Sequence, residues 1–348
     1  MPMKKKKKRR LTRPWIKWPK ERLLDVRLCD LNLKIEGTIL EKRINRLYDE
    51  LENRYLDFRP YFWLSDDWFT PEGLTGTAIP FYLAHPRLVR LERQMIGEAE
   101  GSTQNWFLKF LRHECGHAIT HAFRLNLRRR WQKLFGLSSH SYPRFYRPNP
   151  YSRRHVLHLE YWYAQSHPDE DFAETFAVWL QPRSQWRRQY RGWPTALRKL
   201  EYVNSLMYEI SGERPPVRTR ERVDSLRTLR KTLREHYSRK VPRYAAEYSD
   251  AYDADLYRLF SRDRGRTRRE MASAFIRRHA PEIKRMVTPW VGGRGYHVKL
   301  ILKELIGRCR ELKLYVKGPE RRVKTDFAII LCKHCVDSLY RQRFEVEM

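Results

Sequence analysis

The stretch from Arg112 to Phe123, which reads RHECGHAITHAF, decides how the rest of this 348-residue chain is interpreted. Positions 113–117 form an HExxH motif, and apolar residues around it recur at helical spacing. Side chains four residues apart share one face of a helix, so the two imidazoles of the motif converge on one position. That position can hold a zinc ion, with Glu114 beside it to take a proton from water.

The context of the motif favours a helix that packs closely against another segment. Ser102 or Thr103 can cap its N-terminus, directly after Gly101. Gly116 costs about 1 kcal/mol of helix propensity relative to alanine. We expect this glycine to let a neighbouring segment or the metal approach closely, whereas Cys115 faces away from the two histidines and fills a small space.

A catalytic zinc site needs a third protein ligand, and the sequence excludes the two most familiar positions for it. In the pattern HExxHxxGxxH the last two fixed positions would fall on Thr120 and Phe123, so that pattern fails. A glutamate soon after the motif is also excluded, because no Asp or Glu occurs between Glu114 and Glu160. Any carboxylate ligand must therefore come from Glu160 or a later residue.

The next acidic cluster lies in YAQSHPDEDFAETFAVWL, positions 163–180, which also reads as a helix. Ser166 is a plausible cap, and the acids of the first turn favour the positive end of the helix dipole. Glu170 and Glu174 lie four apart on one face, where one carboxylate can bind the metal and the other can orient a histidine ligand. The residues alone leave open which acid between 169 and 174 is the ligand.

The motif HECGH together with EDFAETFAVW resembles the gluzincin-type zinc-binding metallopeptidases of a bacterial group, and it is more distantly similar to anthrax lethal factor and the Pro-Pro endopeptidases. The stretches CDLNLKIEGT, PYFWLSDDWFTPEG and IPFYLAHPRLVRLE also resemble the bacterial group. The resemblance covers about residues 21–210. It implies that His113, His117 and Glu170 bind Zn2+ and that Glu114 is the general base for hydrolysis of peptide bonds.

The same resemblance implies roles for three further residues. Glu174 matches the second glutamate of the EDFAETFAVW motif and would orient a metal ligand without binding the metal itself. Tyr163 falls where the lethal-factor-like enzymes carry a tyrosine that stabilises the transition state, and Tyr161 is a nearby alternative. Asp171 replaces an aromatic residue of the distant relatives and competes with Glu170 as the ligand.

The predicted fold is α+β, with a zincin-like catalytic domain in which a small sheet packs beside the HExxH helix and a second, glutamate-bearing helix. Its elements, read from hydrophobic periodicity, are a strand or interfacial segment at Leu23–Glu36, a helix at Thr38–Leu56 and strands at Tyr61–Leu64, Gly76–Leu83 and Leu88–Met95. An edge strand of such a sheet could pair with an extended substrate. The segment Phe135–Arg154, rich in Pro, Tyr and Ser, is predicted to form a loop near the site.

Three regions are expected along the chain: a basic disordered tail at 1–20, the gluzincin-like metallopeptidase domain at 21–212, and a basic, mostly α-helical domain of unknown role at 217–348. The boundary is suggested by glycine and prolines between Ser211 and Pro216. Helices are predicted at Glu201–Ile210, Val223–Tyr237, Asp250–Phe260, Arg268–Val287, Val298–Leu314 and Lys324–Arg343.

Composition adds a second signal, a formal net charge of +31. Such a chain attracts nucleic acid or another polyanion, so the alternative hypothesis is a basic nucleic-acid-associated protein with a zinc site. An inactive, peptidase-like protein that binds a partner is a third reading. No run approaches the roughly 20 apolar residues of a membrane span, and no signal-peptide core appears, so we expect a cytoplasmic protein that acts on a peptide or protein substrate.

Overall fold

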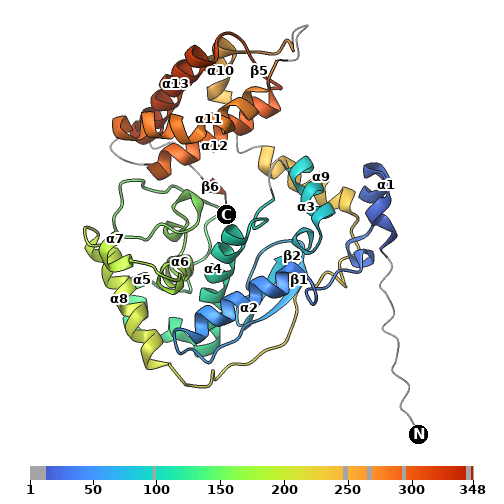
Figure 1. The fold of residues 1–348 in the computed structure, drawn as a ribbon. Coiled ribbons are helices and arrows are strands. Elements are labelled where there is room, and N and C mark those ends of the chain that lie inside the picture. The colour runs from blue at the N-terminus through green and yellow to red at the C-terminus, as the bar shows by residue number, and fades with distance from the viewer. Residues whose placement is uncertain are drawn as a thin grey trace.

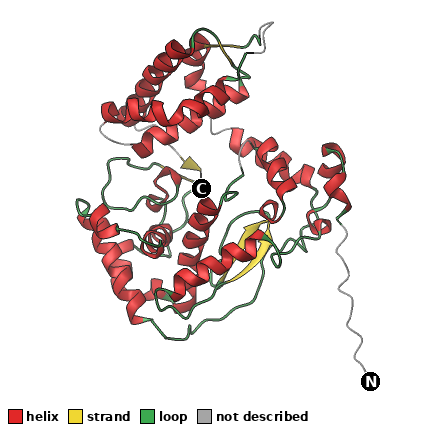
Figure 2. Ribbon diagram, in the orientation of Figure 1, coloured by secondary structure: helices red, strands yellow, loops and turns green. Residues whose placement is uncertain are grey.

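A pair of parallel strands and several long helices form the part of the chain that carries the HExxH motif. The structure is a computed structural model, and it describes residues 13–96, 99–245, 250–264, 269–291, 295–341 and 346–347. Within that part of the chain the fold is a mixture of helix and strand in which helices predominate (Figures 1 and 2). None of the helices described is long and apolar enough to cross a membrane.

The first group of helices precedes residue 246 and includes the HExxH helix, α4. They are α1 (Lys20–Leu24), α2 (Ile39–Glu52), α3 (Pro86–Met95), α4 (Gln104–Phe123), α5 (Arg129–Phe135), α6 (Pro168–Leu180), α7 (Trp186–Gln189), α8 (Pro194–Glu209) and α9 (Leu233–Ala245). The later helices form a separate bundle, drawn in orange and red in Figure 1: α10 (Asp253–Leu259), α11 (Ala272–Val287), α12 (Gly295–Glu311) and α13 (Glu320–Arg341).

A parallel pair of strands, β1 (Tyr61–Ser65) and β2 (Gly76–Pro80), lies beside α4. This confirms the small sheet predicted next to the HExxH helix, although β2 ends earlier than expected and continues as a 3-10 turn at Phe81–Ala84. Both edges of the pair have a neighbour. Leu226 donates its amide to the carbonyl of Leu64 at 2.7 Å, and on the other side Ala78 donates to the carbonyl of Phe69 at 2.9 Å.

The other strands are short antiparallel pairs that join segments far apart in the sequence. They are β3 (Phe145–Tyr146) with β6 (Val346–Glu347), and β4 (Phe260–Ser261) with β5 (Tyr315–Val316). The β3 strand lies within the long predicted loop between α5 and α6. The loop prediction for Phe135–Arg154 is otherwise confirmed.

Two hydrophobic cores divide the chain. The first packs around α2, α4, α6 and α8, and it still includes Leu233 and Tyr237 of α9. The second lies inside the later bundle and runs from Tyr252 to Cys335. The division between these two cores falls between Tyr237 and Tyr252. Between the predicted boundary near 211–216 and this point, the chain runs back along β1.

Residues 13–20 of the region predicted as a disordered tail are ordered in the structure. Residues 1–12 lie outside the described part of the chain, but Trp15 is buried in the first core and donates its indole N–H to the carbonyl of Leu31 at 3.1 Å. A short 3-10 turn, Pro14–Lys17, carries this tryptophan. Burial of a large aromatic ring outweighs the cost of ordering a few basic residues around it.

Three secondary-structure predictions were wrong. Leu88–Met95 is not a strand but part of α3, because His85 caps the helix by accepting the amide of Arg87 at 3.2 Å and Pro86 suits its first turn. The segment Leu23–Glu36 forms the end of α1 and a 3-10 turn instead of a strand. Residues 223–232 are not helical, because their backbone instead contacts β1 and the N-terminal segment.

Candidate metal centre

The HExxH motif lies in the middle of α4, a twenty-residue helix that is mostly buried. Thr103 caps this helix and accepts the amide of Trp106 at 3.3 Å, in line with one of the two predicted caps. The helix ends at Phe123, after which Arg124 takes the left-handed conformation. His113 and His117 lie one turn apart and face the same neighbour, α6.

Helix α6 packs unusually close to α4 at Gly116. A Cβ atom placed on Gly116 would lie 2.7 Å from Cα of Ala173, closer than side chains tolerate. This confirms the prediction that the glycine permits a close approach. The cap of α6 is His167, which accepts the amide of Asp169 at 3.2 Å, and not Ser166, whose hydroxyl donates to the carbonyl of Tyr163 instead.

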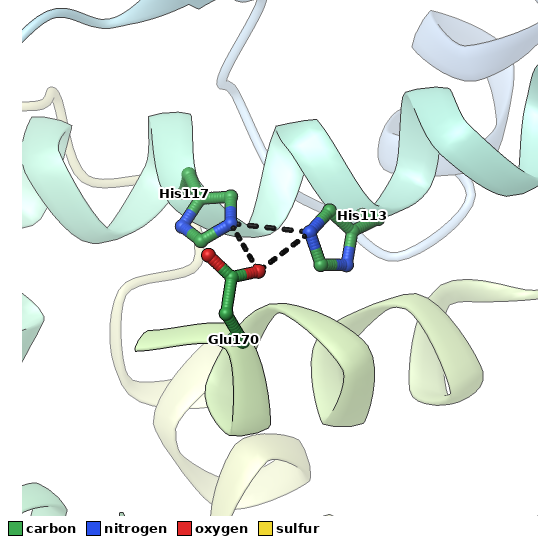
Figure 3. Close-up of side chains that lie close together, drawn as sticks. All are labelled: His113, His117 and Glu170. Carbon is green, nitrogen blue, oxygen red and sulfur yellow. Dashed lines mark hydrogen bonds and ion pairs between the residues drawn. The ribbon is translucent and has the colours of Figure 1, made fainter. Parts of the chain in front are cut away.

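The close approach brings three ligand atoms together (Figure 3). Oε2 of Glu170 lies 3.0 Å from Nε2 of His113 and 3.2 Å from Nε2 of His117, and the two nitrogens are 3.2 Å apart. Within the described residues, these three side chains are the group of His, Cys, Asp or Glu whose ligand atoms all lie within 4.8 Å of one another. Two imidazoles and one carboxylate suit a zinc ion.

Glu174 occupies the far side of His113. Its Oε1 accepts the Nδ1 hydrogen of His113 at 2.8 Å, and its Oε2 accepts the amide of Leu159 at 2.7 Å. Burial alone would lower the pKa of His113, but its hydrogen bonds to Glu170 and Glu174 outweigh this and raise the pKa to about 10. Glu174 therefore binds Nδ1 of His113, and the Nε2 atom on the other side of the ring faces Glu170.

The carboxylate of Glu170 is the negative centre of the group. Burial would raise its pKa, but the two imidazoles hold the pKa of this carboxyl well below its ordinary range. Its second oxygen, Oε1, accepts the hydroxyl of Tyr142 at 2.9 Å. Glu170 therefore has one oxygen fixed by the protein and the other directed at the histidines.

Glu114 lies on the same helix and faces the loop between β1 and β2. Thr70 donates its hydroxyl to Oε2 of Glu114 at 2.8 Å, and Thr77 of β2 lies 2.7 Å from the same hydroxyl. Burial raises the pKa of Glu114, although the nearby histidines oppose this. Thr70 was not predicted from the sequence, where an isolated threonine after a strand gives no signal.

Tyr163 lies against the first histidine of the motif. Its ring centroid is 5.6 Å from that of His113, at an interplanar angle of 52°. Burial, reinforced by Glu170 and Glu114, raises the pKa of its phenol well above the ordinary value. The predicted alternative, Tyr161, has a left-handed backbone. It is one of the groups that raise the pKa of Tyr252, a residue of the later bundle.

The other candidates around α6 are engaged elsewhere. Asp171 is buried and pairs with Lys199 of α8, on the side of α6 away from the histidines. Asp169 accepts a hydrogen bond from Ser138. His167 uses Nδ1 for the helix cap and donates from Nε2 to the carbonyl of His140 at 2.8 Å. The described structure thus groups Glu170, and not its acidic neighbours, with the two histidines.

Tyr142 is a second contact of the centre, after Thr70, that the sequence did not reveal. It stacks on His167 with ring centroids 3.9 Å apart while its hydroxyl reaches Glu170. From the sequence, the surrounding stretch Phe135–Arg154 was predicted only as a loop near the site, without a role for any single residue. Tyr142 lies too far from Glu170 in the sequence for helical or strand spacing to predict that the two residues meet.

Comparison with known proteins supports the metal assignment for this part of the chain. Residues 91–189 match the model of a family described as "Putative zinc-binding metallo-peptidase". The matched range contains α4 and α6 and therefore every residue of the His113, His117 and Glu170 group. Searches among curated proteins and among solved structures gave no match. Over residues 91–189 the chain is thus similar to a family of zinc-binding peptidases.

Proposed function

We propose that this protein is a zinc-dependent metallopeptidase of the gluzincin type. The observation that carries the proposal is the convergence of His113, His117 and Glu170 within 4.8 Å, on the two helices that lie inside the family match. Peptidase sites of this type use two histidines and one glutamate and leave a coordination position open. The proposed substrate is a peptide or protein.

The three donor atoms are of the types that zinc binds, and neighbouring side chains hold the ligand residues in place. Both imidazole Nε2 atoms lie within 3.2 Å of one carboxylate oxygen of Glu170, so that the three possible ligand atoms converge. Glu174 binds the far nitrogen of His113, and Tyr142 binds the far oxygen of Glu170. Such outer contacts orient ligands and typically change metal affinity by about 10- to 100-fold.

Glu114 is the proposed general base. When bound, zinc polarises the scissile carbonyl and lowers the pKa of water. Glu114 takes a proton from the attacking water and delivers it to the leaving nitrogen. Its buried carboxylate, held by Thr70 at 2.8 Å, has a raised pKa, which suits a group that must accept and then release a proton.

Tyr163 is the proposed donor to the oxyanion that forms on the substrate carbonyl. Its ring lies beside His113, and its raised pKa keeps the phenol protonated at neutral pH. Preorganised donors of this kind typically contribute about 2.7–4 kcal/mol to transition-state stabilisation. Tyr146, whose ring centroid is 6.5 Å from that of Tyr163, packs on its other side.

Cleavage of a peptide library tests the activity. The zinc-loaded protein should cleave peptides, a chelator should abolish the cleavage, and Glu114→Gln should abolish it while zinc remains bound. The matched control is Glu201→Gln, which makes the same change on an exposed position of α8 and should cleave as wild type does. Zinc-loaded wild type that cleaves no peptide in the library would contradict the proposal.

A further inference from the structure

The short strand β3 carries an interaction that the catalytic proposal does not use. It pairs antiparallel with β6, so that Phe145 lies opposite Glu347 and Tyr146 opposite Val346. The two strands are about 200 positions apart in the sequence. Figure 1 shows β6 between the later bundle and the end of α4.

Two aromatic contacts, Tyr146 with Tyr163 and Tyr163 with His113, connect β3 to the first histidine of the motif. The Tyr146 hydroxyl donates to the carbonyl of Tyr161 at 2.9 Å, and its ring packs on Tyr163 at 6.5 Å between centroids. Tyr163 in turn contacts His113 at 5.6 Å. The Tyr146 side chain therefore joins β3 to the segment that carries the proposed oxyanion donor.

The residues just before β3 reach the third member of the group. Tyr142 binds Glu170 at 2.9 Å and stacks on His167. Phe145 itself is 46% exposed, with the guanidinium of Arg144 over its ring at 5.2 Å. The strand thus lies beside the metal centre: Tyr146 of β3 approaches it from the histidine side, and Tyr142, three residues before the strand, from the glutamate side.

Strand addition at such a rim is a common way to bind an extended peptide, because main-chain hydrogen bonds do not depend on the peptide's sequence. The β1–β2 sheet is less suited to it here, since Leu226 and Phe69 already contact its two edges. In the described structure β3 is instead paired with a segment from beyond the second core. That segment occupies the position of an added peptide strand.

We propose that β3 is the edge to which an extended peptide substrate adds, and that Val346–Glu347 compete with the substrate for this edge. The inference deepens the proposed peptidase function and rests on it. The sequence around β6 reads FEVEM and alternates apolar with acidic residues, whereas β3 is flanked by Arg144 and Arg147. The preferred substrate is therefore an extended peptide with acidic side chains.

Peptide binding to the metal-free protein tests the edge without catalysis. The probe is a fluorescent synthetic peptide of residues 341–348, and its affinity is measured by anisotropy. Two prolines, Val346→Pro with Glu347→Pro, remove both amide hydrogens from β6, so the probe should bind about tenfold more tightly than to wild type, given millimolar effective concentrations for tethered segments.

The matched control is Val346→Ala with Glu347→Ala, which removes the same side chains but keeps the amides. We expect it to bind the probe within about threefold of wild type. Equal affinity for wild type and the proline variant would overturn the proposal. Equal tightening in the proline and alanine variants would overturn main-chain pairing as its basis.

Kinetics separate this inference from the peptidase proposal. In the zinc-loaded proline variant, KM for an acidic peptide should fall about tenfold while kcat stays unchanged, because only the competing segment has been released. An unchanged KM in an active enzyme overturns the competition. If no variant cleaves peptides, the peptidase proposal fails, and the binding measurement still decides whether β6 occupies a peptide-binding edge.

Discussion

The carboxylate of Glu174 holds Nδ1 of His113 at 2.8 Å, and this contact turns the opposite nitrogen of the ring toward Glu170. Both glutamates come from one face of α6, one turn apart. Glu174 is fully buried, and its second oxygen is bound by the amide of Leu159. One face of α6 therefore provides both the carboxylate of Glu170, which faces the histidines, and the carboxylate of Glu174, which orients the ring of His113.

Replacing Glu174 with glutamine should weaken zinc binding by about 10- to 100-fold without removing a ligand. The amide is uncharged, so it supports the His113 ring less well when that ring faces a cation. Competition with a chromophoric chelator measures the affinity. Glu201→Gln, on the exposed surface of α8, should bind zinc as tightly as wild type, and equal affinities in both variants would remove Glu174 from the site.

Gly116→Ala should destabilise the protein by about 1–3 kcal/mol, because the new methyl group meets the backbone of Ala173 at 2.7 Å. The gain in helix propensity, about 1 kcal/mol, opposes this but does not relieve the clash. Urea unfolding measures the change. Gly192→Ala is the control, since its Cβ would meet nothing within 4 Å, and a Gly116→Ala protein as stable as this control would contradict the close helix contact.

Tyr142→Phe should lower zinc affinity by about tenfold while leaving the fold stable, because it frees Oε1 of Glu170 but keeps the ring on His167. The measurement is the same chelator competition, with the free energy of unfolding determined in parallel. Tyr208→Phe, which alters a side chain that is 84% exposed, serves as the control. Unchanged affinity in Tyr142→Phe would mean that the tyrosine only packs.

Glu160 joins the two cores by pairing with Lys299 at 2.7 Å and Lys303 at 3.0 Å. Burial would raise its pKa, but the two lysines outweigh burial and lower it from 4.5 to about 2. When the pKa of a carboxyl is lower in the folded than in the unfolded state, its ion pairs stabilise the folded protein fully at a pH above the unfolded-state pKa. This stabilisation is lost as the pH falls through the folded-state pKa. Wild type should therefore be more stable than Glu160→Gln above about pH 4.5, and the difference should shrink toward pH 2.

Denaturant unfolding of both proteins from pH 7 downward measures that difference. Each titration must be compared at one ionic strength, because exposed lysines are screened by salt. A constant difference across the range would contradict the account of the Glu160 pair.

The sequence was most informative where chemistry depends on local spacing. Residues four apart on a helix predicted the HExxH face and the Glu170 and Glu174 face, because helical geometry alone brings them together. Gly116 was interpretable for the same reason, since a glycine inside a buried helix usually marks close packing. The β1 and β2 strands were also evident from their short apolar runs.

The sequence was least informative where contacts join distant segments. Tyr142 and Thr70 reach the centre through loop paths that no periodicity encodes. The helix α3 was mistaken for a strand although His85 can cap it and Pro86 suits its first turn. That Asp171 pairs with Lys199 of another helix, and not with His113 or His117, is likewise a contact between distant segments.

Zinc content is the most direct test of the central claim that His113, His117 and Glu170 hold a catalytic metal. Elemental analysis of purified wild type and Asp169→Asn should show stoichiometric zinc, and His113→Ala and Glu170→Gln should show little, with folding checked by circular dichroism. Asp169 is the matched control, because it lies one residue away on the same helix turn but contacts Ser138 instead. Folded wild type without zinc affinity, or full zinc retention in Glu170→Gln, would contradict the account.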